Sequence, residues 1–184
     1  DLFPKANDDS RVFVEWLLES KYATDNLEIT QIGASVGGLL ALNLSMIHNF
    51  ATVTWSAPLV YSRFLAEHED IKPSTDAAGE FGETDPKRVQ QAFYKFFTLT
   101  YLGTEDTLHK AEELDALHLF HDRIGKVLFY NSTSELVPVQ DTLDFIQVLA
   151  DNNLPATLKT LAGSGHAMAY AKEVLDDSLE FLAK

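Results

Sequence analysis

The stretch QIGASVGGLLAL, residues 31–42, places one serine in a G-x-S-x-G pattern formed by Gly33, Ser35 and Gly37. In hydrolytic enzymes this pattern sets a nucleophilic serine on a sharp strand-to-helix turn, where glycines two positions away on each side leave room for the chain. The same letters also arise when a small serine happens to lie among glycines. An apolar run precedes this serine and a helical pattern follows it, so we predict that Ser35 is a nucleophile. The backbone N–H of Val36 would then donate to a developing oxyanion.

A nucleophilic serine needs a base, and His166 is the best placed of the six histidines. It lies in the segment AGSGHAMAY, directly after the last predicted strand, at the end of the sheet where open α/β folds bind ligands. With Gly163 and Gly165 beside it, His166 could equally be a turn residue, but its position after Ser35 in the chain favours the base. The other histidines lie in helical or inserted segments and are interpreted as surface or packing residues: His48, His68, His109, His118 and His121.

A carboxylate that orients the histidine is expected in the loop after the strand KVLFYNS. Glu135 is the acid in that loop, which reads STSELVPV. The alternative for Glu135 is a solvated loop carboxylate. Asp141 opens the following helix and is interpreted as a first-turn residue that the helix dipole favours.

Four short runs rich in β-branched and aliphatic residues alternate with helical patterns, which indicates a parallel sheet covered on both faces. Because helical crossovers join the strands, we expect them to be parallel neighbours in chain order: 27–33, 51–55, 127–131 and 156–161. The fold class is therefore α/β.

Three further helices are predicted around these strands, in addition to the one that follows Ser35. The first begins near residues 8–10 and places Val12, Phe13, Trp16 and Leu17 on one face. The second covers residues 140–153. The last places the following residues on one side: Ala171, Val174, Leu175, Ser178, Phe181 and Leu182.

We predict one domain, 1–184, in which residues 1–58 and 122–184 form the core and residues 59–121 form a cap or lid insertion. The first part of the insertion is acidic and rich in Gly, Pro, Ser and Thr, so an exposed, mobile loop is expected. A helix follows from about residue 88 and ends at Gly103. Its side chains Phe93, Phe97 and Tyr101 line a substrate pocket in one interpretation and form the core of the insertion in the other.

Composition excludes several classes of partner and site. The formal net charge of −14 would repel the phosphates of nucleic acids, and the absence of cysteine excludes disulfides and thiolate metal sites. No segment resembles a membrane span or a signal peptide. We therefore expect a cytoplasmic protein, although a signal removed before the first residue would leave no trace. We expect no metal, no cofactor and no nucleic-acid partner.

With these residues in place, the chain resembles the α/β-hydrolase superfamily, in particular its small esterase, dienelactone-hydrolase and serine-peptidase-like branch. IGASVGGLLAL is similar to the elbow and its helix, VLFYNSTSELVPV to the acid strand and loop, and GSGHAM to the histidine loop. The resemblance implies Ser35 as nucleophile, His166 as general base and acid, and Glu135 as orienting carboxylate. It implies a serine hydrolase that cleaves a carboxylic ester through an acyl-enzyme, without a cofactor.

The chain departs from the family pattern in two ways. The family's acid position corresponds to Ser134, so Glu135 stands one residue late, and Asn131 and Ser132 replace the usual glycine at the end of this strand. Family members also place about four strands before the elbow, including the source of a second oxyanion donor, whereas 34 residues precede Ser35 here. The alternatives are a peptidase or thioesterase with the same triad, or a non-catalytic binding or scaffold protein that retains the fold.

The second departure would leave the strand 27–33 at the edge of the sheet. This segment contains no proline, and Glu28 is its one charged residue, so it lacks the usual protection of an edge strand. We expect it to pair with an amino-terminal segment of the same gene product or with another chain.

Overall fold

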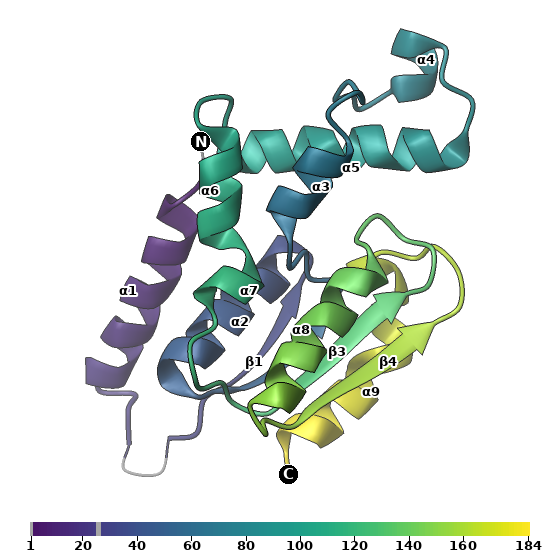
Figure 1. Ribbon diagram of the computed structural model, residues 1–184. Coiled ribbons are helices and arrows are strands. Elements are labelled where there is room, and N and C mark those ends of the chain that lie inside the picture. Colours follow the sequence, from purple (N-terminus) through teal and green to yellow (C-terminus); the bar gives the residue numbers. More distant parts are fainter. Residues whose placement is uncertain (1, 25–26) are drawn as a thin grey trace.

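A four-stranded parallel sheet forms the centre of the protein (Figure 1). The computed structural model describes residues 2–24 and 27–184. The sheet order is β1-β2-β3-β4, with β1 (Thr30–Ala34), β2 (Ala51–Trp55), β3 (Val127–Ser132) and β4 (Ala156–Leu161). The predicted order and direction are confirmed. The first strand begins at Thr30 rather than at residue 27, and residues 25–26 lie outside the described part of the chain.

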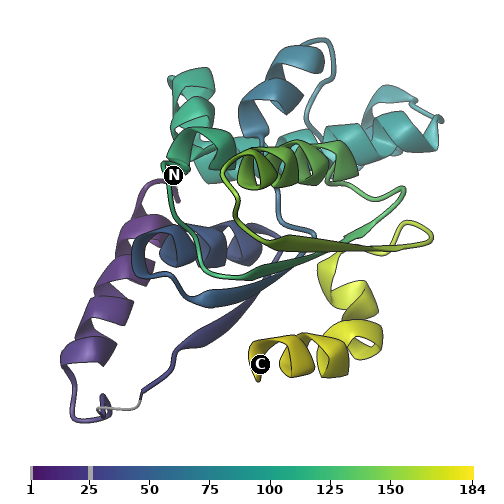
Figure 2. The ribbon, with the colours of Figure 1, turned by 60° about the horizontal axis from the view of Figure 1, so that its bottom comes forward.

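Helices cover both faces of this sheet, as the alternation along β3 requires. Val127 and Phe129 pack with α2 (Val36–His48) and α8 (Val139–Asp151) on one face, in the larger hydrophobic cluster. Leu128 and Tyr130 pack on the other face, in a second cluster that includes α9 (Ala171–Leu182) and the preceding 3₁₀ turn η1 (Ala167–Tyr170). Figure 2 shows this arrangement, with α9 on the side of the sheet opposite to α2 and α8. The α/β fold class is confirmed.

The first helix, α1 (Lys5–Glu19), forms where a helix was predicted but turns a different face inward. Val12, Phe13 and Trp16 are each more than half exposed, whereas Val14 is buried. Ala6 packs against the larger cluster. The inward face therefore carries smaller side chains, and a cavity of about 270 Å³ is lined by residues of both α1 and α2. The predicted burial of the aromatic face was wrong.

Five helices lie between β2 and β3; the first three lie beyond the carboxyl end of the sheet, and the last two run back toward α2 (Figure 1). They are α3 (Tyr61–Glu67), α4 (Ala77–Phe81), α5 (Pro86–Leu102), α6 (Thr107–Leu114) and α7 (Ala116–Leu119). The segment expected to be a loop without structure thus contains α4, and Ala77 packs there with Ile71 and Ala92. Side chains of α3, α5, α6 and α7 belong to the same hydrophobic cluster as α2 and α8, so the insertion shares the core of the sheet.

The longest helix of the insertion, α5, begins and ends at the residues that local chemistry favours. The Asp85 carboxylate accepts the N–H of Lys87 at 2.9 Å, Pro86 occupies the first turn, and Gly103 follows the last turn at φ 84°. Of the residues predicted on this helix, Tyr101 is 5% exposed, but Phe97 is 51% exposed, and Tyr94, which was not among the three, is buried at 5%. Tyr94 and Tyr101 both stack on Tyr61 of α3, which explains why this side of α5 faces inward.

Asp115 connects the start of α3 to the junction of α6 and α7. Its carboxylate accepts the backbone N–H of Tyr61 at 2.7 Å and also bonds the Ser62 hydroxyl. The side chain thus satisfies N–H groups that the first turn of a helix leaves without intrahelical partners. This contact fixes the direction in which the chain leaves β2 for the insertion.

An ion pair joins the insertion to α8. Arg63 of α3 donates to Asp141 at 3.0 Å and to Asp144 at 2.6 Å. Asp141 is 2% exposed, so it is more than the first-turn residue expected from the sequence. Burial raises the pKa of the Asp141 carboxyl from 3.8 to about 7, although the Arg63 guanidinium opposes this rise.

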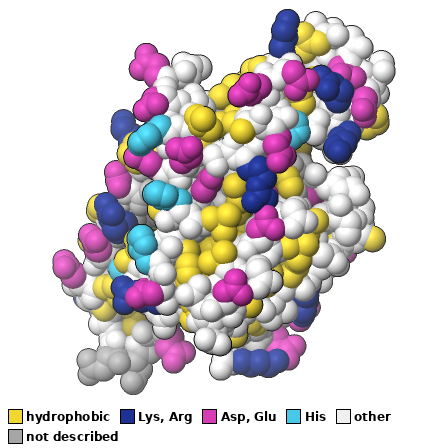
Figure 3. Space-filling model, viewed as in Figure 1, with side chains coloured by type: hydrophobic (Ala, Val, Ile, Leu, Met, Phe, Trp, Pro, Cys, Tyr) yellow, Lys and Arg dark blue, Asp and Glu magenta, His cyan; other side chains and the backbone are white. Residues whose placement is uncertain are grey.

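None of the helices in the described part of the chain combines the length and the apolar character that a membrane crossing requires. On the face shown in Figure 3, Lys and Arg side chains are interspersed with Asp and Glu, in keeping with the acidic composition.

The buried Asp141 predicts a pH-dependent stability. Its pKa is higher in the folded than in the unfolded chain, so the folded protein binds the proton more tightly between about pH 4 and pH 7. The free energy of unfolding should fall as pH rises through this window, by about 1.4 kcal/mol for each unit of pKa difference. In urea unfolding from pH 4 to pH 8, the free energy of unfolding of Asp141→Asn should fall less with rising pH than that of the parent.

Asp144→Asn is the matched control. Asp144 bonds the same guanidinium, but its pKa is lowered by the Gln140 amide and by Arg63. This variant should keep the fall in stability that Asp141 causes. If the free energy of unfolding fell by the same amount in the parent and in Asp141→Asn over this pH range, the assignment of the pH dependence to Asp141 would be contradicted.

The edge position of β1 predicts association. Among the described residues, β1 pairs with β2 alone, and the exposed side chains of α1 add apolar surface. We expect the isolated chain to self-associate or to bind an added strand at this edge, which remains a prediction. Size-exclusion chromatography with light scattering at several concentrations tests it. A monomer at all concentrations that unfolds cooperatively would contradict it.

Candidate active site

Ser35 lies at the turn between β1 and α2 with a backbone that few residues adopt. Its φ is 52° and its ψ is −129°, a conformation that costs about 1–3 kcal/mol for a non-glycine residue. Two hydrogen bonds hold it: the Ser35 N–H donates to Trp55 O, and the Gly38 N–H donates to Ser35 O, each at 2.8 Å. The turn presents the side chain at the carboxyl end of β1, beside the N-terminus of α2.

The glycines around Ser35 differ in how much the turn needs them. A Cβ on Gly33 would lie 2.2 Å from the carbonyl oxygen of Gly37, and a Cβ on Gly38 would lie 2.8 Å from the Ala57 Cβ. A Cβ on Gly37 would meet nothing within 4 Å. The turn therefore requires glycine at Gly33 and Gly38. The sequence had predicted that Gly33 and Gly37 are the two glycines that leave room for the chain, and for Gly37 this prediction was wrong.

His166 contacts Ser35 although the two residues are 131 positions apart in the chain. Its Nε2 lies 2.9 Å from Ser35 Oγ, and its Nδ1 lies 2.6 Å from Glu135 Oε2. Its side chain is 26% exposed, so one edge of the imidazole remains open to solvent. The three predicted residues thus form one hydrogen-bonded row.

The Glu135 carboxylate is fully buried despite its position in a loop. While Oε2 faces His166, Oε1 accepts the Ser132 N–H at 2.6 Å, the Ser56 hydroxyl at 2.9 Å and the Asn131 amide at 3.4 Å. A buried carboxylate is stable only when such donors replace water. The interpretation of Glu135 as a solvated loop carboxylate was therefore wrong.

Glu135 stands one residue later than the family's acid, and the conformation of the loop after β3 compensates for this difference. Ser134, which occupies the family's acid position, is exposed. The Thr133 N–H donates to Leu161 O and the Ser134 N–H donates to Gly163 O, each at 2.9 Å, so the acid loop follows the histidine loop closely. The longer glutamate side chain then turns back toward Ser132. The residues that replaced the family's glycine, Asn131 and Ser132, are donors to this carboxylate.

Sequence reasoning missed Ser56 and Tyr170, whose hydroxyls lie 2.6 Å apart beneath the row. Both are buried, at 0% and 4% exposed. Ser56 directly follows β2, at the sheet end where ligands bind in α/β folds, and this position was the one available signal.

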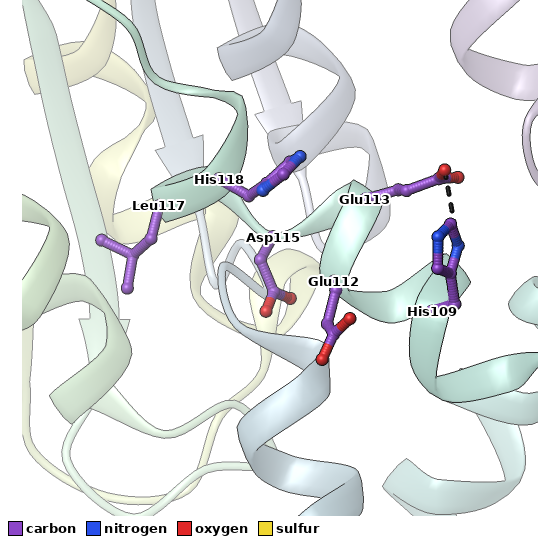
Figure 4. A pocket seen from close by; sticks show the side chains of 6 residues that line it. All are labelled: His109, Glu112, Glu113, Asp115, Leu117 and His118. Carbon is purple, nitrogen blue, oxygen red and sulfur yellow. Dashed lines mark ion pairs between the residues drawn. The ribbon is translucent and has the colours of Figure 1, made fainter.

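Two of the histidines in the insertion lie away from the row. His109 and His118 border a cavity of about 470 Å³ on α6 and α7, where His109 pairs with Glu113 (Figure 4). Asp115 also borders it but is engaged by the first turn of α3. Among the described residues, no group of three or more His, Asp or Glu side chains is arranged to hold a metal ion.

A cavity of about 550 Å³ borders the acid and histidine loops. Its wall includes Phe64 of α3, His68 directly after that helix, Gln91 of α5, and Leu136 and Ser164 of the two loops. The predicted pocket residues lie differently: Tyr101 is buried and bonds Asn7, and Phe93 packs edge-to-face on the exposed Phe97. Their role in binding substrate stays a prediction.

Comparison with known proteins relates the chain to hydrolases through structure alone. No protein-family model and no curated protein sequence matches it. A truncated carbohydrate esterase from gut microbiota matches 100% of the chain with a TM-score of 0.67 at 14% identity. Carboxyl esterase 2 from the fungus Tuber melanosporum matches 99% with a TM-score of 0.66 at 16% identity. A puromycin-hydrolyzing peptidase from Mycobacterium tuberculosis matches 96% with a TM-score of 0.64 at 18% identity.

These similarities establish the fold. The chain has the α/β-hydrolase fold, which confirms the resemblance inferred from its motifs. It spans 70% of the carbohydrate esterase, 63% of the fungal esterase and 24% of the peptidase. At such low identity the similarity shows the shared fold alone, and an activity must be argued from the site itself.

The unequal glycines give a direct test of the turn. Gly37→Ala should fold and gain about 0.5 kcal/mol, because alanine favours the helix and the site has room for a methyl group. Gly33→Ala should lose about 3 kcal/mol or more, because its methyl group would overlap a backbone carbonyl. Urea unfolding of both variants measures this difference. Equal losses of stability would contradict the geometry of the turn.

Proposed function

We propose that this chain is a serine hydrolase that cleaves a carboxylic ester through an acyl-enzyme. The observation that supports it is the continuous row of Ser35 Oγ, His166 and Glu135, with contacts of 2.9 and 2.6 Å. A serine hydroxyl, an imidazole and a buried carboxylate in this order form the Ser-His-acid arrangement known from unrelated folds. No other nucleophile or cofactor is needed for this chemistry.

In the proposed first half-reaction, Ser35 Oγ attacks the ester carbonyl carbon while His166 Nε2 takes the hydroxyl proton. The carbonyl oxygen becomes an oxyanion, and the Val36 N–H at the start of α2 donates to it. The positive end of the α2 dipole favours the same charge. When the intermediate collapses, the bond to the alkoxy oxygen breaks, and the alcohol leaves with the proton from His166.

The second half-reaction repeats these steps with water. His166 removes a proton from a water molecule, whose oxygen attacks the acyl carbon. The Ser35 ester bond then breaks, Ser35 Oγ recovers its proton from His166, and the carboxylic acid departs. The exposed edge of the imidazole gives water its access.

Glu135 would act by fixing the imidazole. Its Oε2 accepts the Nδ1–H, so the lone pair of Nε2 points at Ser35. The carboxylate also stabilises the imidazolium that forms in both half-reactions. The donors on Oε1 keep the negative charge in place without water.

The 550 Å³ cavity is the proposed place for one side of the ester. It borders the acid and histidine loops, and the insertion supplies Phe64, Gln91 and Pro86 to its wall. A mostly apolar wall with a few polar groups is typical of small-ligand pockets. We propose that residues 59–121 act as a cap that shapes this pocket.

A peptidase is the second candidate, since peptidases are among the structures with this fold. The same row would attack an amide, whose poorer leaving group makes the reaction harder. A scaffold without turnover is a third, and the late position of the acid had been a reason for it. Glu135 nevertheless lies 2.6 Å from His166, so the late position of the acid no longer argues for a scaffold.

A fluorophosphonate probe tests the nucleophile. Attack by Ser35 Oγ on phosphorus expels fluoride, so the parent chain should become labelled at Ser35 and Ser35→Ala should remain unlabelled. Hydrolysis of p-nitrophenyl esters of increasing acyl length should identify the preferred ester, and Ser35→Ala should lower kcat by at least ~10³-fold. The corresponding p-nitroanilides separate an esterase from a peptidase.

Ser10→Ala is the control, because Ser10 lies on α1 and its hydroxyl bonds the carbonyl of Ala6. It should be labelled at the parent rate. A parent chain that is folded, unlabelled and inactive on all esters and anilides would contradict the proposal and favour the scaffold.

A further inference from the structure

Ser56 is a buried hydroxyl directly beneath the proposed catalytic row. It follows the last residue of β2 and is 0% exposed. Its Oγ lies 2.9 Å from Glu135 Oε1, 2.9 Å from the Ala167 nitrogen and 2.6 Å from the Tyr170 hydroxyl. One side chain thus contacts the acid loop, the residue after His166 and the turn that leads into α9.

The hydrogen-bonding capacity of Ser56 is fully used. The Ala167 N–H must donate, and the Glu135 carboxylate must accept, so Ser56 donates its single proton to Glu135. Burial raises the pKa of Tyr170 above its usual range, so Tyr170 retains its proton. That proton has two acceptors within reach, Ser56 Oγ at 2.6 Å and the Tyr130 carbonyl oxygen at 3.1 Å, and the shorter contact favours donation to Ser56. Ser56 Oγ then donates one bond, to Glu135, and accepts two.

Two uncommon backbone conformations meet at this hydroxyl. Ser56 has φ 53° and Ala167 has φ 47°, and each costs about 1–3 kcal/mol in a residue with a side chain. The Ala167 N–H donates to the Ser56 Oγ, so the two conformations support each other. Such conformations persist where the surroundings determine them, and they gather at functional sites.

The dipeptide Trp55-Ser56 contacts every part of the row. Trp55 O accepts the Ser35 N–H at 2.8 Å, and the next residue bonds both Glu135 and the neighbour of His166. The Ser56 N–H itself donates to Tyr130 O on β3 at 2.8 Å, which anchors the dipeptide in the sheet. Ser132 also joins the acid to the histidine loop, but through two separate groups: its N–H donates to Glu135 and its hydroxyl donates to the Gly165 carbonyl.

We propose that Ser56 is a positioning residue that holds Glu135 and His166 at the separation needed for Ser35 to be activated. The inference rests on the proposed function. Ser56 does not contact the row's nucleophile or the proposed pocket, so it would act on the rate of acyl transfer and leave substrate binding unchanged.

Ser56→Gly is the informative variant. It removes the hydroxyl, but glycine adopts a positive φ without strain, so part of the lost stability is recovered. Ser56→Ala removes the hydroxyl and keeps the strain. Thr54→Val is the matched control, because Thr54 lies on the same strand and its buried hydroxyl has no hydrogen-bond partner.

We expect Ser56→Gly to lower kcat for the preferred p-nitrophenyl ester by about 10- to 100-fold, with KM unchanged, because a small displacement of catalytic groups has effects of this size. The rate of fluorophosphonate labelling should fall by the same factor. Thr54→Val should retain the parent values. Across Ser56→Gly, Ser56→Ala and Thr54→Val, the changes in the midpoint of urea unfolding should not parallel the changes in kcat.

A measurement independent of turnover separates this inference from the proposed function. We expect the proton between His166 Nδ1 and Glu135 to give a far-downfield proton NMR signal, because the two atoms lie 2.6 Å apart, and its loss in His166→Ala would assign it. It should broaden or move upfield in Ser56→Gly and persist in Thr54→Val. If the parent shows no activity, the proposed function fails, and this signal still decides whether Ser56 positions the pair.

Either of two results overturns the inference. One is a kcat within about 2-fold of the parent together with an unchanged downfield signal in Ser56→Gly. The other is an equal fall in kcat and stability in Ser56→Gly and Thr54→Val, which would assign Ser56 a purely structural role.

Discussion

The buried carboxylate of Glu135 is the group around which the site is organised. Its charge is removed from water, so every part of the structure near it must supply a hydrogen bond. The donors come from the end of β3, from the end of β2 and from His166. Removing any one of them leaves part of a buried charge uncompensated, and the cost of such a loss explains why three separate segments converge on one side chain.

The parallel sheet makes this convergence geometrically simple. The carboxyl ends of β1 to β4 lie in chain order, and each is followed by a residue of the site: Ser35 lies at the end of β1, Ser56 after β2, Glu135 after β3 and His166 after β4. The sheet sets the lateral spacing, and the loops need to adjust only the last few ångströms. The insertion then leaves β2 just beyond Ser56, so that α3, α4 and α5 lie over the same end of the sheet, whereas α6 and α7 lead back to the start of β3 (Figure 1).

The sequence was sufficient for the strand order, the fold class and the residues of the row, because hydrophobic alternation and loop positions are local signals. Which side of a helix faces inward depends on contacts with distant segments, so the local sequence did not predict it. On α1 the bulky face around Trp16 is exposed, whereas Val14 of the same helix is buried. The burial of Asp141 depends on Arg63 from a distant helix, and Gly37 differs from Gly33 only through the path of the folded backbone.

The turnover of Glu135→Gln tests the central claim most directly. The amide would keep its oxygen toward the Ser132 N–H and turn its NH₂ toward His166, so that Nδ1 must accept and Nε2 carries the proton. An imidazole in that tautomer cannot take the Ser35 proton. We predict a fall in kcat for the preferred ester of about 10³- to 10⁴-fold with cooperative unfolding retained. A kcat within a few-fold of the parent would contradict the account.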